Sequence, residues 1–213
     1  MLERIISSFC LFIACIVLNG CADTDKQSSA PFVTLMTDRG EITLELYTER
    51  APVTVANFLA YVEAGHYDEG EIYRVVRFDN DRGDPKINVI QGGLNLAQAA
   101  PLPSIEHETT DKTGILHTDG VISMARLDPG TAASEFFISI GDNAGLDYGG
   151  TRNPDKQGFA AFGRVIDGME VVREIHALTE TAPADDPYFE GQILAEPVKF
   201  SARYKDYSGE YNE

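Results

Sequence analysis

The chain has 213 residues, a formal net charge of −17, no Trp and only three Cys. A protein this acidic repels nucleic acid and anionic lipid headgroups, so its charge favours neither of them as a binding partner. The length suits one ordinary domain with a sizeable core, and the sequence has no internal repeat.

The N-terminus predicts export. An apolar run from Ile5 to Leu18 is shorter than the ~20 residues that a membrane-spanning helix needs, and it suits the apolar part of a secretory signal. The sequence Leu18-Asn19-Gly20-Cys21 resembles a bacterial lipoprotein signal, in which the Cys thiol takes up lipid. We therefore expect removal of residues 1–20 and lipidation of Cys21. An ordinary signal peptide with a chance Cys is the alternative.

A polar tether is expected over residues 21–31, counting the lipidated Cys. Cys10 and Cys15 lie in the removed segment, so the mature domain keeps no thiol for a disulfide, a metal or a nucleophile. Because the domain is acidic, attachment to the membrane rests on acyl chains. These features predict a lipid-anchored protein of the bacterial cell envelope. It would face the periplasm, with the outer membrane as one option, or the exterior.

Beyond the tether, short apolar segments with period-2 alternation predict a mainly β domain over residues 32–204. The predicted strands are 33–38, 41–46, 72–76, 121–125, 136–140, 160–165 and 193–203. One helix is expected from Pro52, whose missing N–H costs little in a first turn, to about Ala64. A second is expected from Gly168 to Ala177. Residues 78–86 indicate a polar loop, and residues 205–213 a polar tail. From these patterns alone the chain is an all-β or α+β domain.

Five blocks in a fixed order carry a more specific resemblance. They are Tyr73-Arg74-Val75-Val76, Val89-Ile90-Gln91-Gly92-Gly93, Val121–Arg126, Thr131–Ile140 and Gly158–Val165. Together they resemble the cyclophilins, the prolyl cis/trans isomerases. The resemblance implies a closed antiparallel eight-stranded barrel capped by two α-helices. It also implies action on X-Pro segments of unfolded or exported proteins, without a cofactor and as a monomer.

Prolyl isomerisation must overcome the partial double bond of the amide, a barrier of ~18–20 kcal/mol. A fixed cation beside the prolyl nitrogen draws its lone pair out of resonance, while an apolar pocket holds the ring. The resemblance gives the role of the cation to Arg74 and makes Gln91 the residue that orients it. Without the resemblance, Arg74 indicates a structural ion pair on a barrel wall.

The resemblance also assigns substrate contacts. They fall on Phe137, Leu146, Phe159, Ala125, Arg126, Glu135 and Val89. For each the alternative is an ordinary core or wall residue, and that is our expectation for Phe136.

Several positions depart from the family pattern. Asn88 and Gly145 stand where the family has aromatic residues, so the pocket loses an aromatic side unless the loop 77–87 supplies Phe78. Glu135 replaces a Gln, and its carboxylate would either fix Arg74 or quench its field. Residues 147–158 form a longer segment than usual, which we expect to be a mobile polar flap.

The four His show no metal-binding spacing, so no metal site is expected, and His107 and His117 should satisfy loop backbone groups. The leading hypothesis is an isomerase that assists the folding of exported proteins. Because of the departures, a catalytically weak scaffold or chaperone that binds Pro-containing segments is the first alternative. A structural lipoprotein that uses no groove is the second.

Overall fold

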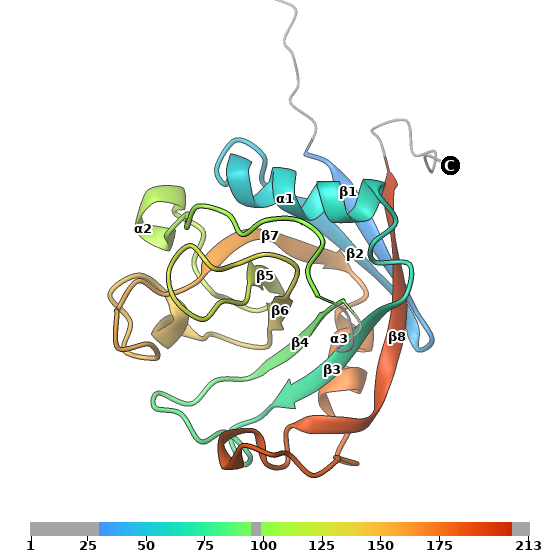
Figure 1. Ribbon diagram of the computed structural model, residues 1–213, viewed down its shortest axis with the longest axis vertical. Coiled ribbons are helices and arrows are strands. Elements are labelled where there is room, and N and C mark those ends of the chain that lie inside the picture. Colours follow the sequence, from blue (N-terminus) through green and yellow to red (C-terminus); the bar gives the residue numbers. More distant parts are fainter. Residues whose placement is uncertain (1–29, 95–98, 206–213) are drawn as a thin grey trace, which may run out of the picture.

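A computed structural model describes residues 30–94 and 99–205 of the chain. In this part, eight strands close into one antiparallel barrel in the order β1-β2-β7-β5-β6-β4-β3-β8 (Figure 1). The strands are β1 Phe32–Thr37, β2 Gly40–Leu46, β3 Gly70–Val76, β4 Val89–Gly93, β5 Val121–Met124, β6 Phe136–Ser139, β7 Ala160–Asp167 and β8 Ile193–Lys205. The expected barrel is confirmed. β4 was not among the predicted strands, because its Gln-Gly-Gly end is typical of a turn.

The two predicted helices are present as α1 (Pro52–Glu63) and α3 (Met169–His176). α1 packs against β7 and β8, and α3 packs against β2, β3 and β4. A single turn, α2 (Thr110–Thr113), and two short 3₁₀ helices, η1 (Ala144–Leu146) and η2 (Pro187–Phe189), complete the described elements. These three escaped prediction because so few residues leave no helical period in the sequence.

Strand alternation divides the apolar residues between two clusters. The barrel interior holds Phe58 of α1, Phe136 of β6 and Phe162 of β7, all nearly inaccessible to solvent. Burial of each such ring contributes about 1.5–3 kcal/mol. The neighbour Phe137 points the other way and joins a small cluster outside the barrel with Val76, Ile87, Val89 and Leu146. The expectation that Phe136 is core is confirmed, and the second cluster forms the floor of the site described below.

The two ends of the described chain lie side by side, since Phe32 of β1 pairs with Lys205 of β8. Figure 1 shows these two ends beside α1, and η2 at the opposite end of the molecule. The predicted signal peptide, Cys21, nearly all of the tether and residues 206–213 of the predicted tail fall outside the described residues. No helix within the described residues is long and apolar enough to cross a membrane.

Candidate active site

Three neighbouring strands place three of the predicted residues in one row. Arg74 of β3 lies opposite Gln91 of β4, and Gln91 lies opposite Phe137 of β6. Residues directly opposite on paired strands share a face of the sheet. A groove of about 460 Å³ opens over this row. Eight of the predicted residues line it: Arg74, Val89, Gln91, Ala125, Arg126, Phe137, Leu146 and Phe159.

The floor of the groove is dry and apolar. Phe137 is 5 % exposed and Leu146 is 1 % exposed, and the rings of Phe137 and Phe159 meet edge to face with centroids 5.3 Å apart. Val89 and Ile87 close the remaining side. Such a pocket can hold an apolar ring about the size of a proline side chain and exclude water from it.

Arg74 stands at the rim and is held from two sides. Its Nη1 donates to Oε1 of Gln91 at 2.8 Å, and its Nε and Nη2 donate to Oε1 of Gln192 at 2.9 and 2.7 Å. The register of β3 shifts between Ile72 and Arg74 against both of its neighbours, and a bulge of this kind re-aims a side chain. Burial lowers the pKa of Arg74. An arginine nevertheless keeps its charge in proteins, so a fixed cation borders a dry pocket.

Gln192 was missed by the sequence analysis. Its side chain has no exposed surface, and its Nε2 donates to the backbone oxygens of Asn80 and Tyr188 at 2.9 and 3.2 Å. Its own carbonyl oxygen accepts from the N–H of Val75, so the β3–β8 ladder sets its place. A lone Gln before a strand carries no pattern that could have marked it.

Aromatic rings enter the groove from η2, a second feature that was not predicted. The Cζ of Arg74 lies 4.7 Å from the ring centroid of Phe189 and 5.8 Å from that of Tyr188. Contacts of a guanidinium with aromatic faces are attractive. Phe78, the residue expected to replace the lost aromatic side, is 53 % exposed and does not line the groove. That suggestion was wrong, because the polar loop turns its ring outward.

Asn88 and Gly145 have structural explanations. The Oδ1 of Asn88 accepts from the N–H of Phe78 at 3.2 Å, and its N–H donates to Oδ1 of Asn143 at 2.9 Å, so Asn88 joins two loops behind the groove. A Cβ at Gly145 would lie 2.2 Å from Cγ of Pro85, so Pro85 fills the space where a side chain would begin. Neither departure opens the floor of the pocket.

Glu135 forms no ion pair with Arg74 among the described residues, so the direct pairing by which it could have fixed Arg74 is absent. Its Oε2 accepts from the hydroxyl of Tyr73 at 2.7 Å. It lines a smaller hollow that adjoins the groove at Gln91 and Ala125. Glu135 precedes β6 and reaches over the backbone of Gly93, which keeps its carboxylate away from the guanidinium.

The segment 147–158, for which we expected a mobile flap, is joined to the rest of the fold at two points. Arg126 makes a bidentate pair with Asp155, at 2.9 Å for each bond, while its guanidinium lies 5.2 Å from the ring centroid of Phe159. Arg152 pairs with Asp81 at 2.7 Å in an almost completely buried contact. Its length and composition favoured mobility, but charge pairs within the fold hold it beside the groove.

The two His residues with a predicted role, His107 and His117, differ in what their rings contact. The ring of His107 contacts the backbone oxygen of Gln157 at 3.2 Å, as predicted. The ring of His117 instead bonds two side chains, Asp147 at 2.7 Å and Ser123 at 3.0 Å, and stacks behind Phe137. That prediction was wrong because the ring is buried beneath the pocket floor. The described residues contain no group of three or more His, Cys, Asp or Glu placed to hold a metal.

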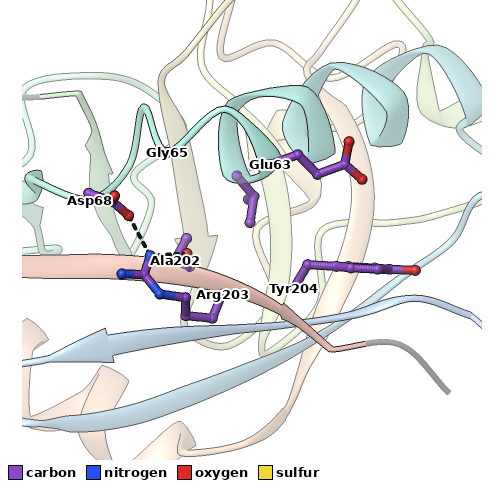
Figure 2. A pocket seen from close by; sticks show the side chains of 7 residues that line it. Glu63, Gly65, Asp68, Ala202, Arg203 and Tyr204 are labelled. Carbon is purple, nitrogen blue, oxygen red and sulfur yellow. Dashed lines mark hydrogen bonds and ion pairs between the residues drawn. The ribbon is translucent and has the colours of Figure 1, made fainter. Parts of the chain in front are cut away.

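A second hollow lies between the end of α1 and β8 and shares no residue with the groove (Figure 2). Figure 2 shows Glu63, Gly65 and Tyr204 around it, and the guanidinium of Arg203 paired with Asp68 across it. Its charged groups are exposed, and its floor has no apolar pocket that could hold a proline ring. The chemistry of the row Arg74–Gln91–Phe137 is not repeated there.

Comparison with known proteins agrees with this geometry. The model of the cyclophilin type peptidyl-prolyl cis-trans isomerase family matches residues 32–195. The chain is 39 % identical over 147 residues to peptidyl-prolyl cis-trans isomerase cyp18 of Streptomyces antibioticus, covering 67 % of this chain and 81 % of the relative. It is 30 % identical over 175 residues to peptidyl-prolyl cis-trans isomerase B of Escherichia coli, covering 77 % of this chain and 99 % of the relative.

Solved structures support the fold. A cyclophilin type isomerase of Cryptosporidium parvum, crystallised in the presence of the dipeptide Ala-Pro, superposes with a TM-score of 0.59 at 19 % identity, covering 80 % of this chain and 96 % of that one. A cyclophilin from Hirschia baltica gives a TM-score of 0.58 at 20 % identity, covering 80 % of this chain and 72 % of that one. With its barrel, its groove and these relatives, the chain belongs to the cyclophilin-type peptidyl-prolyl cis-trans isomerases.

Proposed function

We propose that this isomerase acts on X-Pro segments of exported proteins during their folding, from a position on the bacterial envelope. The observation that carries the catalytic part is the guanidinium of Arg74, held by Gln91 and Gln192 at the rim of the apolar pocket. The Cryptosporidium relative was crystallised in the presence of Ala-Pro, which supports Pro-containing peptides as ligands here.

The reaction needs no proton transfer. The proline ring enters the pocket of Phe137, Leu146 and Val89, while the acyl part of the X-Pro bond stays at the rim. The hydrogen bonds to Gln91 and Gln192 use three of the five guanidinium N–H groups of Arg74. The remaining N–H groups face the prolyl nitrogen and draw its lone pair out of the amide. The bond then loses double-bond character and rotates more easily.

The catalytic proposal is tested by the refolding of a protein whose slow phase is limited by proline isomerisation. We expect the chain without its signal to accelerate this phase. Arg74→Ala should reduce kcat/KM by about 100-fold, the effect of removing one preorganised donor. Glu63→Ala, at the hollow of Figure 2, is the matched control and should refold the substrate at the wild-type rate. Equal acceleration by Arg74→Ala would remove Arg74 from the mechanism.

The envelope location rests on the Leu18–Cys21 sequence and the polar tether. The first described strand begins beside α1, at the other end of the molecule from η2 (Figure 1). A lipid at Cys21 would therefore leave the η2 side of the groove turned away from the membrane. Cys21→Ser should release the protein from membranes or leave it unprocessed. Unchanged membrane fractionation of this variant contradicts lipidation.

A further inference from the structure

A chain of hydrogen bonds leads from Arg74 to a carboxylate at the edge of the groove. Nη1 of Arg74 donates to Oε1 of Gln91 at 2.8 Å, Nε2 of Gln91 donates to the hydroxyl of Tyr73 at 2.9 Å, and that hydroxyl donates to Oε2 of Glu135 at 2.7 Å. We propose that Glu135 is a positioning residue, which acts through Tyr73 and Gln91 to fix the orientation of Arg74. The proposal deepens the proposed function and rests on it.

The donor-to-acceptor direction of this series of hydrogen bonds follows from counting protons. An ionised carboxylate only accepts, so the single hydroxyl proton of Tyr73 is directed to Glu135. The oxygen of Tyr73 is then free to accept, and it faces the NH₂ group of Gln91. The amide of Gln91 must therefore turn its carbonyl oxygen toward Arg74. If the amide were reversed, its NH₂ group would face the guanidinium, donor against donor.

The two amides that hold Arg74 differ in what orients them. The NH₂ group of Gln192 donates to two backbone oxygens, those of Asn80 and Tyr188, which have no donor state and no titration. The NH₂ group of Gln91 donates to a hydroxyl, which can give or accept a proton. Only the Gln91 side therefore needs a further group to set its direction, and Glu135 is that group.

The surroundings of Glu135 leave the carboxylate dependent on hydrogen bonds. It accepts from Tyr73 of β3, weakly from the hydroxyl of its neighbour Ser134 at 3.3 Å, and from the backbone at Leu94. The other titratable groups that interact with it are the phenols of Tyr61 on α1 and Tyr67 after α1. No Lys, Arg or His of the described residues forms an ion pair with it. Burial raises the pKa of Glu135, against these hydrogen bonds.

Protonation should loosen the hydrogen-bond chain. A protonated Glu135 can donate to the oxygen of Tyr73, and the hydroxyl proton of Tyr73 is then no longer directed to Glu135. The NH₂ group of Gln91 would lose its fixed acceptor, and Gln91 would hold Arg74 less firmly. Catalysis should therefore be intact above the raised pKa of Glu135 and decline as the pH falls through it. Simple quenching of Arg74 by the carboxylate predicts the opposite, because protonation would then increase activity.

The test is the pH profile of kcat/KM for the full-length protein on a proline peptide without titratable side chains, for wild type, Glu135→Gln, Tyr73→Phe and Glu63→Gln. We expect an acidic decline in wild type and in the Glu63→Gln control. Tyr73→Phe breaks the hydrogen-bond chain and should be about tenfold less active at neutral pH. Glu135→Gln keeps an oxygen that accepts from Tyr73 and should be no more active than wild type, and both variants should lack the acidic decline. Tyr73→Phe keeps the test valid if Glu135→Gln fails to fold.

A Glu135→Gln or Tyr73→Phe protein with wild-type kcat/KM and an unchanged acidic decline overturns the proposal. Higher activity in Glu135→Gln than in wild type also overturns it, in favour of quenching. Arg74→Ala, measured beside them, separates this inference from the function on which it rests. If Arg74→Ala is inactive while Glu135→Gln behaves as wild type, only the relay fails. If Arg74→Ala is fully active, the proposed function fails as well.

Discussion

The two sides of the groove are built in different ways. Gln91 and two residues of the floor come from β4 and β6, where strand alternation directs Val89 and Phe137 to the same outer face. The side that holds Arg74 comes from segments far apart in the chain: the loop 77–87, the segment 147–158 and the residues around η2. A strand pattern can thus specify a pocket, whereas the field of its cation depends on loops that carry no pattern.

The largest effect on stability should come from the ion pair between Arg152 and Asp81, which joins two of these loops at 2.7 Å and is almost fully buried. Arg152→Met leaves a buried carboxylate without its partner, so we expect a loss of about 3–5 kcal/mol in the free energy of unfolding. Urea denaturation measures it. The exposed pair of Arg164 with Glu45 is the control, and Arg164→Met should cost less than about 1 kcal/mol. Equal losses would mean that the loops are not held by this pair.

The same pair gives a pH dependence of stability. Burial alone would raise the pKa of Asp81, but hydrogen bonds from Arg152, Gly83 and Ile87 outweigh it and lower the pKa. The stabilisation is therefore complete above the ordinary pKa of an aspartate and is lost as the pH falls through the lowered value. Stability in acid should fall more steeply in wild type than in Arg152→Met. Parallel curves would contradict the pairing.

Gly145 tests how closely the loops are packed. A Cβ there would lie 2.2 Å from Cγ of Pro85, so Gly145→Ala must displace the loop 77–87. We expect a loss of about 1–3 kcal/mol by denaturation, the usual cost of overpacking. An alanine variant as stable as wild type would show that the loop yields without cost.

Gln192 tests whether Arg74 needs both of its amides. Gln192→Ala removes two of the three hydrogen bonds of the guanidinium while leaving the pocket floor unchanged. We expect kcat/KM for a proline peptide to fall about tenfold, through misplacement of the cation. A change in KM alone, with kcat preserved, would contradict a role in placing Arg74.

The smallest expected effect on kcat/KM distinguishes two aromatic residues, Phe189 in the groove and Phe78 outside it. Phe189→Leu removes a ring that contacts Arg74, and the loss of such a contact is worth about 0.5–2 kcal/mol, so kcat/KM should fall a few-fold. Phe78→Leu changes an exposed ring outside the groove and should leave kcat/KM at the wild-type value. If the two variants were equally impaired, η2 would lose its assigned part in the site.

The sequence was sufficient for residues that lie on strands. Arg74 and Gln91 were predicted from their blocks, and β3–β4 pairing places them opposite each other. Gln192 and Phe189 were missed because they precede β8 in a segment without periodicity, and only the closed barrel brings them to Arg74. Glu135 was identified as important but given the wrong neighbour. The position of the backbone decides which of two nearby polar groups a carboxylate contacts. Here Glu135 lies close over Gly93, and no residue pattern encodes that position.

Catalysis depends most on Arg74 as a cation whose orientation is fixed, and exchange spectroscopy by NMR on an Ala-X-Pro-Phe type peptide tests this directly. The wild type should give exchange between the cis and trans peaks, and Arg74→Ala should abolish it. Arg74→Lys keeps the charge but loses the planar fork that both amides hold, so its exchange should also be severely reduced. Exchange at the wild-type rate in either variant would contradict this role of Arg74.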